Sequence, residues 1–464
     1  MCNVSLNGTQ PTDASIRVLR ALEAAGLEAW YVGGWVRDAL MGRPSHDVDM
    51  CCSGLWQESK AALEAADIAV VESGIKFGGI TAICDDERIE VTTYRLDGFY
   101  TDGRHPQSVE RAASLEDDLA RRDFTVNAMA WHPERGLVDR YDGQGDLKRK
   151  LIRAVGDPKR RFNEDALRML RAVRFACRLD FMIEPKTKQA LAECAPLLDA
   201  VARERVGIEL EGILSTGHGG DAMLRYPELV CAAVPELAPA RGFDQRSVYH
   251  AFNVYEHIAR VLTVAGELAL CDGVAPSSSL MWAAFLHDVS KPDCFTVDHA
   301  GSGHFFGHPE LGAKKARVIM DRLALSHDLV RDVCLLIKYH DKALRPERSC
   351  LLNMMRALSG EGVDTARLID ELMDLKRADT LGKAPSCFYY VETIEEMRAL
   401  AHELLKAGEP HTLKMLAING GDLIRAGVKP GPELGQLLNS ALDAVIEDNI
   451  PNDREALLVH LNLN

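Results

Sequence analysis

Two adjacent glycines and two aspartates near the start of the chain have the types and spacing of a phosphate-handling site. Gly33 and Gly34 follow a short apolar run, and Asp47 and Asp49 come shortly after them. Adjacent glycines let the backbone turn sharply and present N–H groups to an anion. Residues two apart in a strand share one face, so both carboxylates would point to the same side. Mg²⁺ prefers carboxylate oxygens together with substrate phosphates, so this stretch predicts a two-metal site for phosphoryl or nucleotidyl transfer.

Each half of this pattern has an ordinary explanation when it is taken alone. Most Gly-Gly pairs are simple turns, and most Asp-x-Asp pairs lie on a solvated strand edge. Together, in the order strand, turn, helix and strand, they are more specific. A helix that starts just after the glycines, over residues 36–41, would direct the positive end of its dipole at a phosphate.

The elements that must position these residues follow from the hydrophobic spacing. The spacing predicts helices over residues 12–26 and 56–66, and strands over 68–72, 79–84 and 88–95. Glu90, on the last of these strands, is either a third carboxylate near the aspartate pair or an exposed strand residue. Residues 96–106 are rich in Gly, Asp and aromatic side chains, which predicts a mobile loop.

Two further groups of charged residues offer contacts to a nucleotide. The first group, Arg121, Arg122, Asp123 and Asn127, has the side chains needed to grip a triphosphate and a ribose, although a charged helix start has the same composition. The second group belongs to a helix predicted from Asn163 onward and shares roughly one face of it: Asp165, Arg168, Arg171 and Arg174. Such a stripe is ordinarily a solvated face with ion pairs. Its acceptors and forked donors are also the groups that hydrogen-bond base edges.

The rest of the chain is predicted to be mostly helical and contains histidines and carboxylates at long spacings. They are His257, His287, Asp288, His308, His340 and Asp379. A single such histidine is more often a core residue, but ligands on separate helices are how a helical metal site is built. This set predicts a site for a transition metal such as Ni, Co, Mn, Fe or Zn.

Composition limits the class of protein. The chain has 464 residues, which predicts roughly three domains. It lacks a run of 18 apolar residues and a secretory signal, so we expect no membrane association. Twelve scattered cysteines without a C-x-x-C pair predict reduced thiols and a cytoplasmic location. The net charge is −15, yet residues 121–178 contain 15 Lys and Arg against 8 Asp and Glu, which predicts a local nucleic-acid track.

These motifs together resemble the class II tRNA nucleotidyltransferases, the CCA-adding enzymes, whose head is shared with bacterial poly(A) polymerases. Gly33, Gly34, Arg37 and Asp38 with the aspartate pair are similar to the family's first motif. Residues 121–128 resemble its second motif, 139–147 its third, 164–171 its fourth and 203–210 its fifth. The third motif departs from the family pattern, because Asp142 stands where a glycine is common. The second half resembles an HD phosphohydrolase domain.

The resemblance implies an α+β nucleotidyltransferase head with a small mixed sheet, followed by an all-α neck, body and tail. The expected bounds are 1–150, 151–215, 216–390 and 391–464. Asp47 and Asp49 would hold Mg²⁺, Gly34 and Arg37 would hold the triphosphate, and Asp165 and Arg168 would read the base of CTP or ATP. The expected partner is tRNA, and the expected state is a monomer or a homodimer.

Three rival functions fit parts of the same pattern. A poly(A) polymerase shares the head. An HD-type nucleotide phosphohydrolase would use the head only as a binding module. A tRNA-binding protein without activity is a third alternative, which intact Asp47 and Asp49 disfavour. The resemblance also suggests 2′,3′-cyclic phosphates or 2′-nucleotides as substrates of the HD site.

Overall fold

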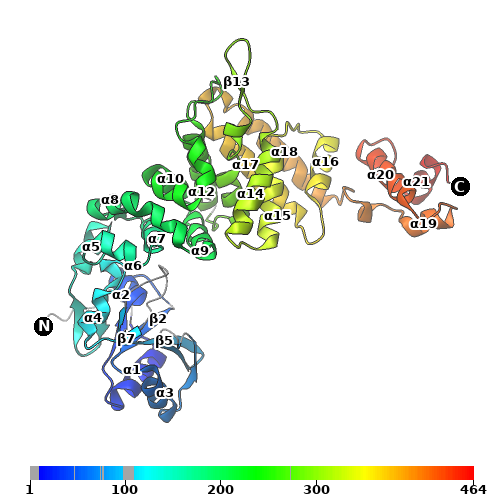
Figure 1. The fold of residues 1–464 in the computed structure, drawn as a ribbon. Helices are drawn as coiled ribbons and strands as arrows, with labels where there is room; N and C mark the ends of the chain where they lie inside the picture. Colours follow the sequence, from blue (N-terminus) through cyan, green and yellow to red (C-terminus); the bar gives the residue numbers. More distant parts are fainter. Residues whose placement is uncertain are drawn as a thin grey trace. The chain divides into compact units, whose positions relative to one another are not determined.

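The chain forms two compact units, seen here in a computed structural model that describes residues 10–45, 47–73, 75, 78–97, 109–271 and 273–463. The first unit comprises Met1–Leu210 and Tyr226–Ala233, and the second comprises Glu211–Arg225 and Val234–Asn464. The elements are coloured along the chain in Figure 1. The division into four domains expected from the sequence is finer than this, and its bounds stay a prediction.

A mixed seven-stranded sheet forms the centre of the first unit. Its strand order is β3-β4-β5-β2-β1-β8-β9. The strands are β1 (Ala29–Val32), β2 (Val48–Cys52), β3 (Ala69–Val71), β4 (Gly79–Cys84), β5 (Glu87–Thr93), β8 (Met129–His132) and β9 (Gly136–Asp139). The pairing of β2 with β5 is parallel, whereas the other neighbours are antiparallel. The expected α+β head with a mixed sheet is therefore confirmed.

Alternation along the strands builds a hydrophobic core on each face of the sheet. Val48 and Met50 pack into one core with helices α1 (Asp13–Ala24) and α3 (Trp56–Ala65). Cys51 packs into the other core with helix α4 (Leu115–Ala120). Because neighbouring strand residues point to opposite faces, Asp49 lies on the α4 side with Cys51.

Most predicted elements are present, with shifts at their ends. The helix expected after the glycines is α2 (Gly33–Leu40), which includes both of them. Strand β2 begins at Val48, so Asp47 precedes the strand instead of belonging to it. The strand predicted over 88–95 stops at Thr93, and Arg95 begins strand β6 (Arg95–Asp97), which pairs with β7 (Val109–Arg111). Residues 98–106 of the expected loop lie outside the described residues.

Short helices follow the sheet. Those of the first unit are α5 (Gly143–Arg149), α6 (Pro158–Glu164), α7 (Arg168–Leu179), α8 (Pro185–Cys194) and α11 (Pro227–Ala233), whereas the boundary at Leu210 falls within α9 (Arg203–Leu214), and α10 (Gly219–Arg225) belongs to the second unit. Strands β10 (Leu151–Ile152) and β11 (Met182–Ile183) pair in parallel between them. The helix start predicted at Asn163 is wrong, because that residue lies inside α6. The backbone of Asp165 is extended, and it separates α6 from α7.

Asp142, the residue that departs from the family pattern, has a left-handed backbone with φ of 60°. Glycine adopts this region without strain, and Asp is among the few other residues that tolerate it. The departure therefore keeps the turn before α5. Asp139 caps the same helix by accepting hydrogen bonds from the N–H groups of Gly143 and Gln144.

The second unit is helical, as expected. It contains α12 (Val254–Cys271), α13 (Ser278–Leu286), α14 (His308–Arg322), α15 (His327–Tyr339), α16 (Arg348–Leu358), α17 (Thr365–Gly382), α18 (Tyr390–Lys406), α19 (Gly420–Arg425), α20 (Pro432–Ile446) and α21 (Arg454–His460). Helix α17 packs against α12, α13, α15, α16 and α18 (Figure 1). A hairpin of β12 (Thr296–Val297) and β13 (Gly303–His304) projects beside them.

We predict that Gly143→Ala destabilises the head by about 1–3 kcal/mol, because overpacking forces buried neighbours apart. A Cβ atom there would lie 2.4 Å from the carbonyl oxygen of Thr125 and 2.8 Å from the sulfur of Met129. Four of the five tryptophans lie in residues 1–150, so urea unfolding followed by tryptophan fluorescence reports on this part. The neighbouring Gln144→Ala is the control and should stay within about 0.5 kcal/mol of wild type. Equal midpoints for both variants would contradict the packing argument.

Candidate active site and a second polar cluster

The parallel register of β2 and β5 places the carboxylates of Asp49 and Glu90 side by side. The two residues are direct partners across the ladder and therefore share one face of the sheet. Burial and the charge of Glu90 raise the pKa of Asp49 to about 6, and Asp47 adds to this effect. Glu90 is exposed on its strand. Both readings of Glu90 are thus met, since it is an exposed strand residue that also neighbours Asp49.

The first glycine of the pair lies directly against this acidic group. A Cβ atom on Gly33 would be 3.4 Å from Oδ2 of Asp49 and 3.2 Å from Nη1 of Arg122, and φ of Gly33 is +67°. Glycine is needed here for both the backbone conformation and the close approach. Helix α2 begins at this residue, so its N-terminal N–H groups start beside the carboxylates and the guanidinium.

Asp118 holds the two arginines of the second motif, and the sequence alone gave no reason to select it. Its side chain is fully buried. Oδ1 accepts hydrogen bonds from Nε and Nη2 of Arg121, at 3.0 and 2.6 Å, and Oδ2 accepts one from Nη2 of Arg122 at 3.0 Å. Although burial opposes the charge, the two arginines lower the pKa of Asp118 below its ordinary value. The sequence signal for this contact is that Arg121 and Arg122 follow Asp118 by three and four residues, a spacing that brings side chains together on a helix.

A series of hydrogen-bonded side chains connects Arg37 to Arg171. Arg37 is buried, makes a two-pronged ion pair with Asp38 and donates to Oδ1 of Asn127 at 2.7 Å. Asn127 in turn donates to Oδ1 of Asp123 at 3.1 Å. Oδ2 of Asp123 accepts two hydrogen bonds from Arg171, at 3.0 and 2.8 Å. The forked donors of Arg37 are therefore engaged within the protein.

The stripe predicted on one helix is divided: Asp165 lies between α6 and α7, and the arginines belong to α7. Asp165 accepts a hydrogen bond from Arg205 of α9 at 3.1 Å. Arg168 donates to Glu164 at 3.0 Å and to the carbonyl oxygen of Arg121 at 3.1 Å. These contacts connect the stripe to the arginines held by Asp118.

Arg174 continues the stripe but points elsewhere. Its Nε donates to Glu209 at 2.7 Å, and its guanidinium lies 5.0 Å from the ring centre of Phe175. The guanidinium groups of Arg37 and Arg171 lie 5.3 and 5.4 Å from the same ring. Cation–π contacts of this kind hold guanidinium planes in place. Phe175 is a second residue that sequence reasoning missed.

Most of the predicted head residues meet at one cavity of about 430 Å³. It is lined by Val32, Asp49, Met50, Glu90, Thr92, Arg95, Arg121, Arg122, Asp123, Asp165, Arg168 and Arg171. The volume is within the range of small-molecule sites. The carboxylates and arginines of this wall together fit a metal-bound triphosphate.

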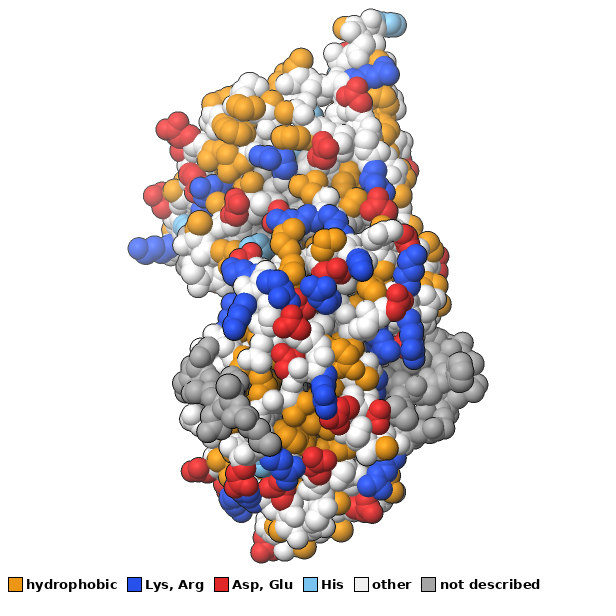
Figure 2. Space-filling model, turned by 90° about the vertical axis from the view of Figure 1, so that its left-hand side faces the viewer, with side chains coloured by type: hydrophobic (Ala, Val, Ile, Leu, Met, Phe, Trp, Pro, Cys, Tyr) orange, Lys and Arg blue, Asp and Glu red, His pale blue; other side chains and the backbone are white. Residues whose placement is uncertain are grey.

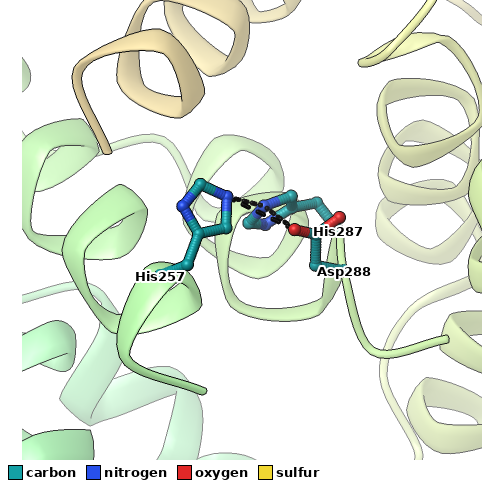
Figure 3. Close-up of side chains that lie close together, drawn as sticks. All are labelled: His257, His287 and Asp288. Atoms are coloured by element: carbon teal, nitrogen blue, oxygen red, sulfur yellow. Dashed lines mark hydrogen bonds and ion pairs between the residues drawn. The ribbon is translucent and has the colours of Figure 1, made fainter. Parts of the chain in front are cut away.

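The six predicted residues of the second unit also come together. His257 of α12 and Asp379 of α17 are 3.1 Å apart, and Asp288 lies 3.3 Å from His257 and 3.2 Å from His287. Figure 3 shows the rings of His257 and His287 and the Asp288 carboxylate pointing toward one another. On the other side of Asp288, Oδ1 lies 3.4 Å from His308 and 3.7 Å from His340. All six residues are buried.

The four imidazoles share one hydrogen-bond arrangement. Their Nδ1 atoms lie 2.7–3.2 Å from main-chain carbonyl oxygens, of Gly382 for His257, Ala284 for His287, Phe305 for His308 and Ile337 for His340. A carbonyl only accepts, so Nδ1 carries the proton and donates. Each Nε2 atom then carries a lone pair and faces the carboxylates of the cluster, which is the usual arrangement of metal-ligating histidines.

Asp288 lies between the two halves of this cluster. Among the described residues, neither of its buried carboxylate oxygens has a hydrogen bond of good geometry. Burial opposes its charge, yet His287 and the ammonium of Lys291 hold the pKa of Asp288 well below its ordinary range. The ligand atoms form two triads, one of His257, His287 and Asp288 and the other of Asp288, His308 and His340. The donor set therefore fits two cations that share Asp288.

Fold and cavity together define a nucleotidyltransferase head on a helical body, and comparison with known proteins gives the family. The model for the poly A polymerase head domain matches residues 29–153. The model for a probable RNA and SrmB-binding site of polymerase A matches residues 180–240, and the putative tRNA nucleotidyltransferase domain 2 matches residues 308–461. The chain is 32% identical to the CCA-adding enzyme of Leuconostoc mesenteroides over 447 residues, which are 95% of this chain and 93% of that enzyme. It belongs to the CCA-adding enzymes, a family of tRNA nucleotidyltransferases.

Other similar proteins support the same family assignment. The CCA-adding enzyme of Pediococcus pentosaceus is 32% identical over 454 residues, which are 96% of each chain. The structure of the Bacillus stearothermophilus CCA-adding enzyme with CTP aligns at a TM-score of 0.71 with 25% identity, covering 98% of each chain. The Thermotoga maritima CCA-adding enzyme with tRNA has the same fold, at a TM-score of 0.60 and 21% identity over 98% of this chain and 96% of that one.

Two findings on the described residues concern the membrane and the cysteines. None of their helices is both long and apolar enough to cross a membrane. The cysteines among them are not joined in disulfides. Figure 2 shows Lys and Arg side chains interspersed with Asp and Glu on the face that it presents.

We predict that Asp118→Asn raises the KM for CTP and for ATP alike, by roughly tenfold, because an amide no longer neutralises Arg121 and Arg122, which then lose their fixed positions. Steady-state incorporation into tRNA that lacks its last nucleotides measures this change. Asp117→Asn is the control, since that side chain accepts from Ser114 and contacts neither arginine. An unchanged KM in Asp118→Asn would show that the clamp does not position these arginines.

Proposed function

We propose that this chain builds or repairs the 3′-terminal CCA of tRNA from CTP and ATP, without a nucleic-acid template. The single observation that carries the proposal is the meeting of Asp49, Glu90 and Arg122 at the start of α2. Membership in the CCA-adding family supports the same reaction and favours it over poly(A) addition. The basic composition of residues 121–178 suits a phosphate backbone. The expected cytoplasmic location and the monomeric or dimeric state stay predictions.

Asp47 and Asp49, with Glu90 beside them, would hold Mg²⁺. The raised pKa of Asp49 supports this assignment, because it reflects burial together with the like charges of Glu90 and Asp47, which a hard cation would neutralise. When bound, Mg²⁺ in such a site activates the attacking 3′-hydroxyl and stabilises the leaving pyrophosphate.

The other predicted head residues would hold the nucleotide. Arg121 and Arg122, fixed by Asp118, suit the triphosphate, together with the N–H of Gly34. Arg171 joins the cavity wall to Asp123, near which a ribose would bind. Asp123 would be held in position by the hydrogen-bonded series Asp38, Arg37 and Asn127. Phe175 would be held in position by Arg174. Asp165 and Arg168 would pair with the base edge.

We predict that Asp47→Ala and Asp49→Ala each abolish nucleotide incorporation, because the metal loses a hard oxygen ligand. Binding of tRNA should largely survive, since neither carboxylate attracts a polyanion. Incorporation of labelled CTP and ATP into tRNA shortened by one, two or three nucleotides measures the first effect, and a filter-binding titration measures the second.

Asp38→Ala is not a suitable control because it releases Arg37. Asp86→Ala, on the turn between β4 and β5, serves instead. Near-wild-type incorporation by both head variants would place the active site elsewhere.

We predict that Asp165→Ala and Arg168→Ala lower the discrimination of CTP and ATP against UTP and GTP. Paired hydrogen bonds to a base edge contribute about 1–3 kcal/mol of discrimination, or roughly 5- to 150-fold. Competitive incorporation measures the ratio. Arg160→Ala is the matched control, because Arg160 is an exposed arginine of α6 that also pairs with Glu164. Unchanged misincorporation in both variants would refute base reading by these side chains.

A second candidate function, a metal-dependent phosphohydrolase, is favoured by the cluster around Asp288. The proposed metal ligands are the six residues His257, His287, Asp288, His308, His340 and Asp379. Imidazole-rich sets suit Ni, Co, Mn, Fe or Zn. When bound there, such a metal lowers the pKa of a water molecule and makes it a nucleophile for a phosphoester. The resemblance to HD phosphohydrolase domains implies 2′-nucleotides and 2′,3′-cyclic phosphates as substrates.

We predict that wild type hydrolyses 2′-AMP or 2′,3′-cyclic AMP when Ni²⁺, Co²⁺ or Mn²⁺ is added, and that His287→Ala does not. Elemental analysis should find bound metal in wild type and less in the variant. His327→Ala is the control, because this histidine is exposed at the start of α15. If neither variant nor wild type binds metal or shows metal-dependent hydrolysis, the helices serve only as a scaffold, and CCA addition is unaffected.

A further inference from the structure

An exposed aromatic ring forms part of the wall of the second cluster's cavity. This cavity has a volume of about 280 Å³, and its wall includes Asp288, His308, His340, His304 and Phe306. Phe306 is 80% exposed. Its ring is stacked on that of His304, with centroids 5.3 Å apart and planes inclined by 7°. Nothing in the assigned chemistry of the cluster requires an exposed phenyl ring beside it.

The stacked pair is held in a fixed place. Nε2 of His304 lies 2.9 Å from Asp298 on the same hairpin. The N–H of Gly303 donates to the carbonyl oxygen of Arg246, and a Cβ atom on Gly303 would lie 2.2 Å from the carbonyl oxygen of Gln245. The hairpin is therefore packed closely against the segment around Gln245 and Arg246, and it carries His304, on which the Phe306 ring stacks.

The adjoining residue connects the ring to the polar part of the cavity. Phe305 packs against Phe295 at 5.4 Å, and Phe295 packs against Phe243 at 5.1 Å. The ammonium of Lys291 lies 5.3 Å from the ring centre of Phe305, 2.7 Å from Asp288 and 3.0 Å from Gln245. One side of the cavity is thus charged and suits a phosphoester, whereas the other side is a flat aromatic surface.

We infer that Phe306 and His304 form a stacking surface for the nucleobase of a phosphoester bound at the second cluster. This inference rests on the phosphohydrolase proposed above and adds a base-binding subsite to it. Bases stack on aromatic side chains irrespective of sequence, and each such contact contributes about 1–3 kcal/mol. A flat ring suits a base better than a sugar or an aliphatic ester, because both faces of the contact are planar and apolar.

The test compares esters with and without a base, in wild type and in Phe306→Leu. With added Ni²⁺ or Co²⁺, we expect kcat/KM for 2′-AMP to fall roughly five- to tenfold in Phe306→Leu. The ratio of kcat/KM for 2′-AMP to that for glycerol 2-phosphate should fall by the same factor. Phe306→Tyr should keep the wild-type ratio. Val297→Ala, an exposed apolar residue on the same hairpin, is the control and should also keep it.

A binding measurement makes the result independent of turnover. Fluorescence of 2-aminopurine riboside monophosphate is quenched on stacking, and we expect saturable quenching by wild type that weakens in Phe306→Leu. Because the head is identical in both proteins, the difference between them comes from this site. Equal quenching, or an unchanged substrate ratio, overturns the stacking inference. Quenching that depends on Phe306 without any hydrolysis supports the nucleobase surface and refutes the hydrolase.

Discussion

The parallel pairing of β2 with β5 is the constraint on which the head depends. It places Asp49 beside Glu90 and so concentrates negative charge where the pKa of Asp49 is already raised by burial. Such a group of acids is unfavourable unless positive charge lies near it. Arg122 supplies that charge at the start of α2, and Asp118 in turn fixes Arg122. The other residues of the cavity wall surround this group of Asp49, Glu90 and Arg122.

A similar principle governs the helical unit. Asp288 is a buried carboxylate surrounded by four imidazoles and one ammonium, without a well-formed hydrogen bond among the described residues. A buried charge of this kind is costly unless it is paired or binds a metal. Main-chain carbonyls at helix ends fix each imidazole through Nδ1, so the backbone determines which nitrogen faces Asp288. Under the functions proposed above, the two sites would share one chemistry, the handling of phosphoesters by metal ligands, on unrelated scaffolds.

The sequence could predict the elements that rest on local periodicity and the residues that belong to recognisable motifs. Helix α1 and strand β4 lie where the spacing of apolar residues predicted them, because hydrophobic periodicity is a local property. The break between α6 and α7 was not predicted. At this break the backbone of Asp165 is extended, and its side chain accepts a hydrogen bond from Arg205. Arg205 lies forty positions further along the chain, so local residue preferences do not predict this contact.

By itself, the sequence determined the family and the mixed α+β head, and it predicted the two groups of ligand residues, because residue types and their order are properties of the chain. Only the tertiary structure decided which of them meet. Glu90 joins Asp49 through a strand register, Arg37 faces inward to Asp38 and Asn127, and Arg174 turns to Glu209. Asp118, Phe175 and Phe306 gained their roles in the same way. Their importance depends on partners brought close by packing, which residue spacing does not encode.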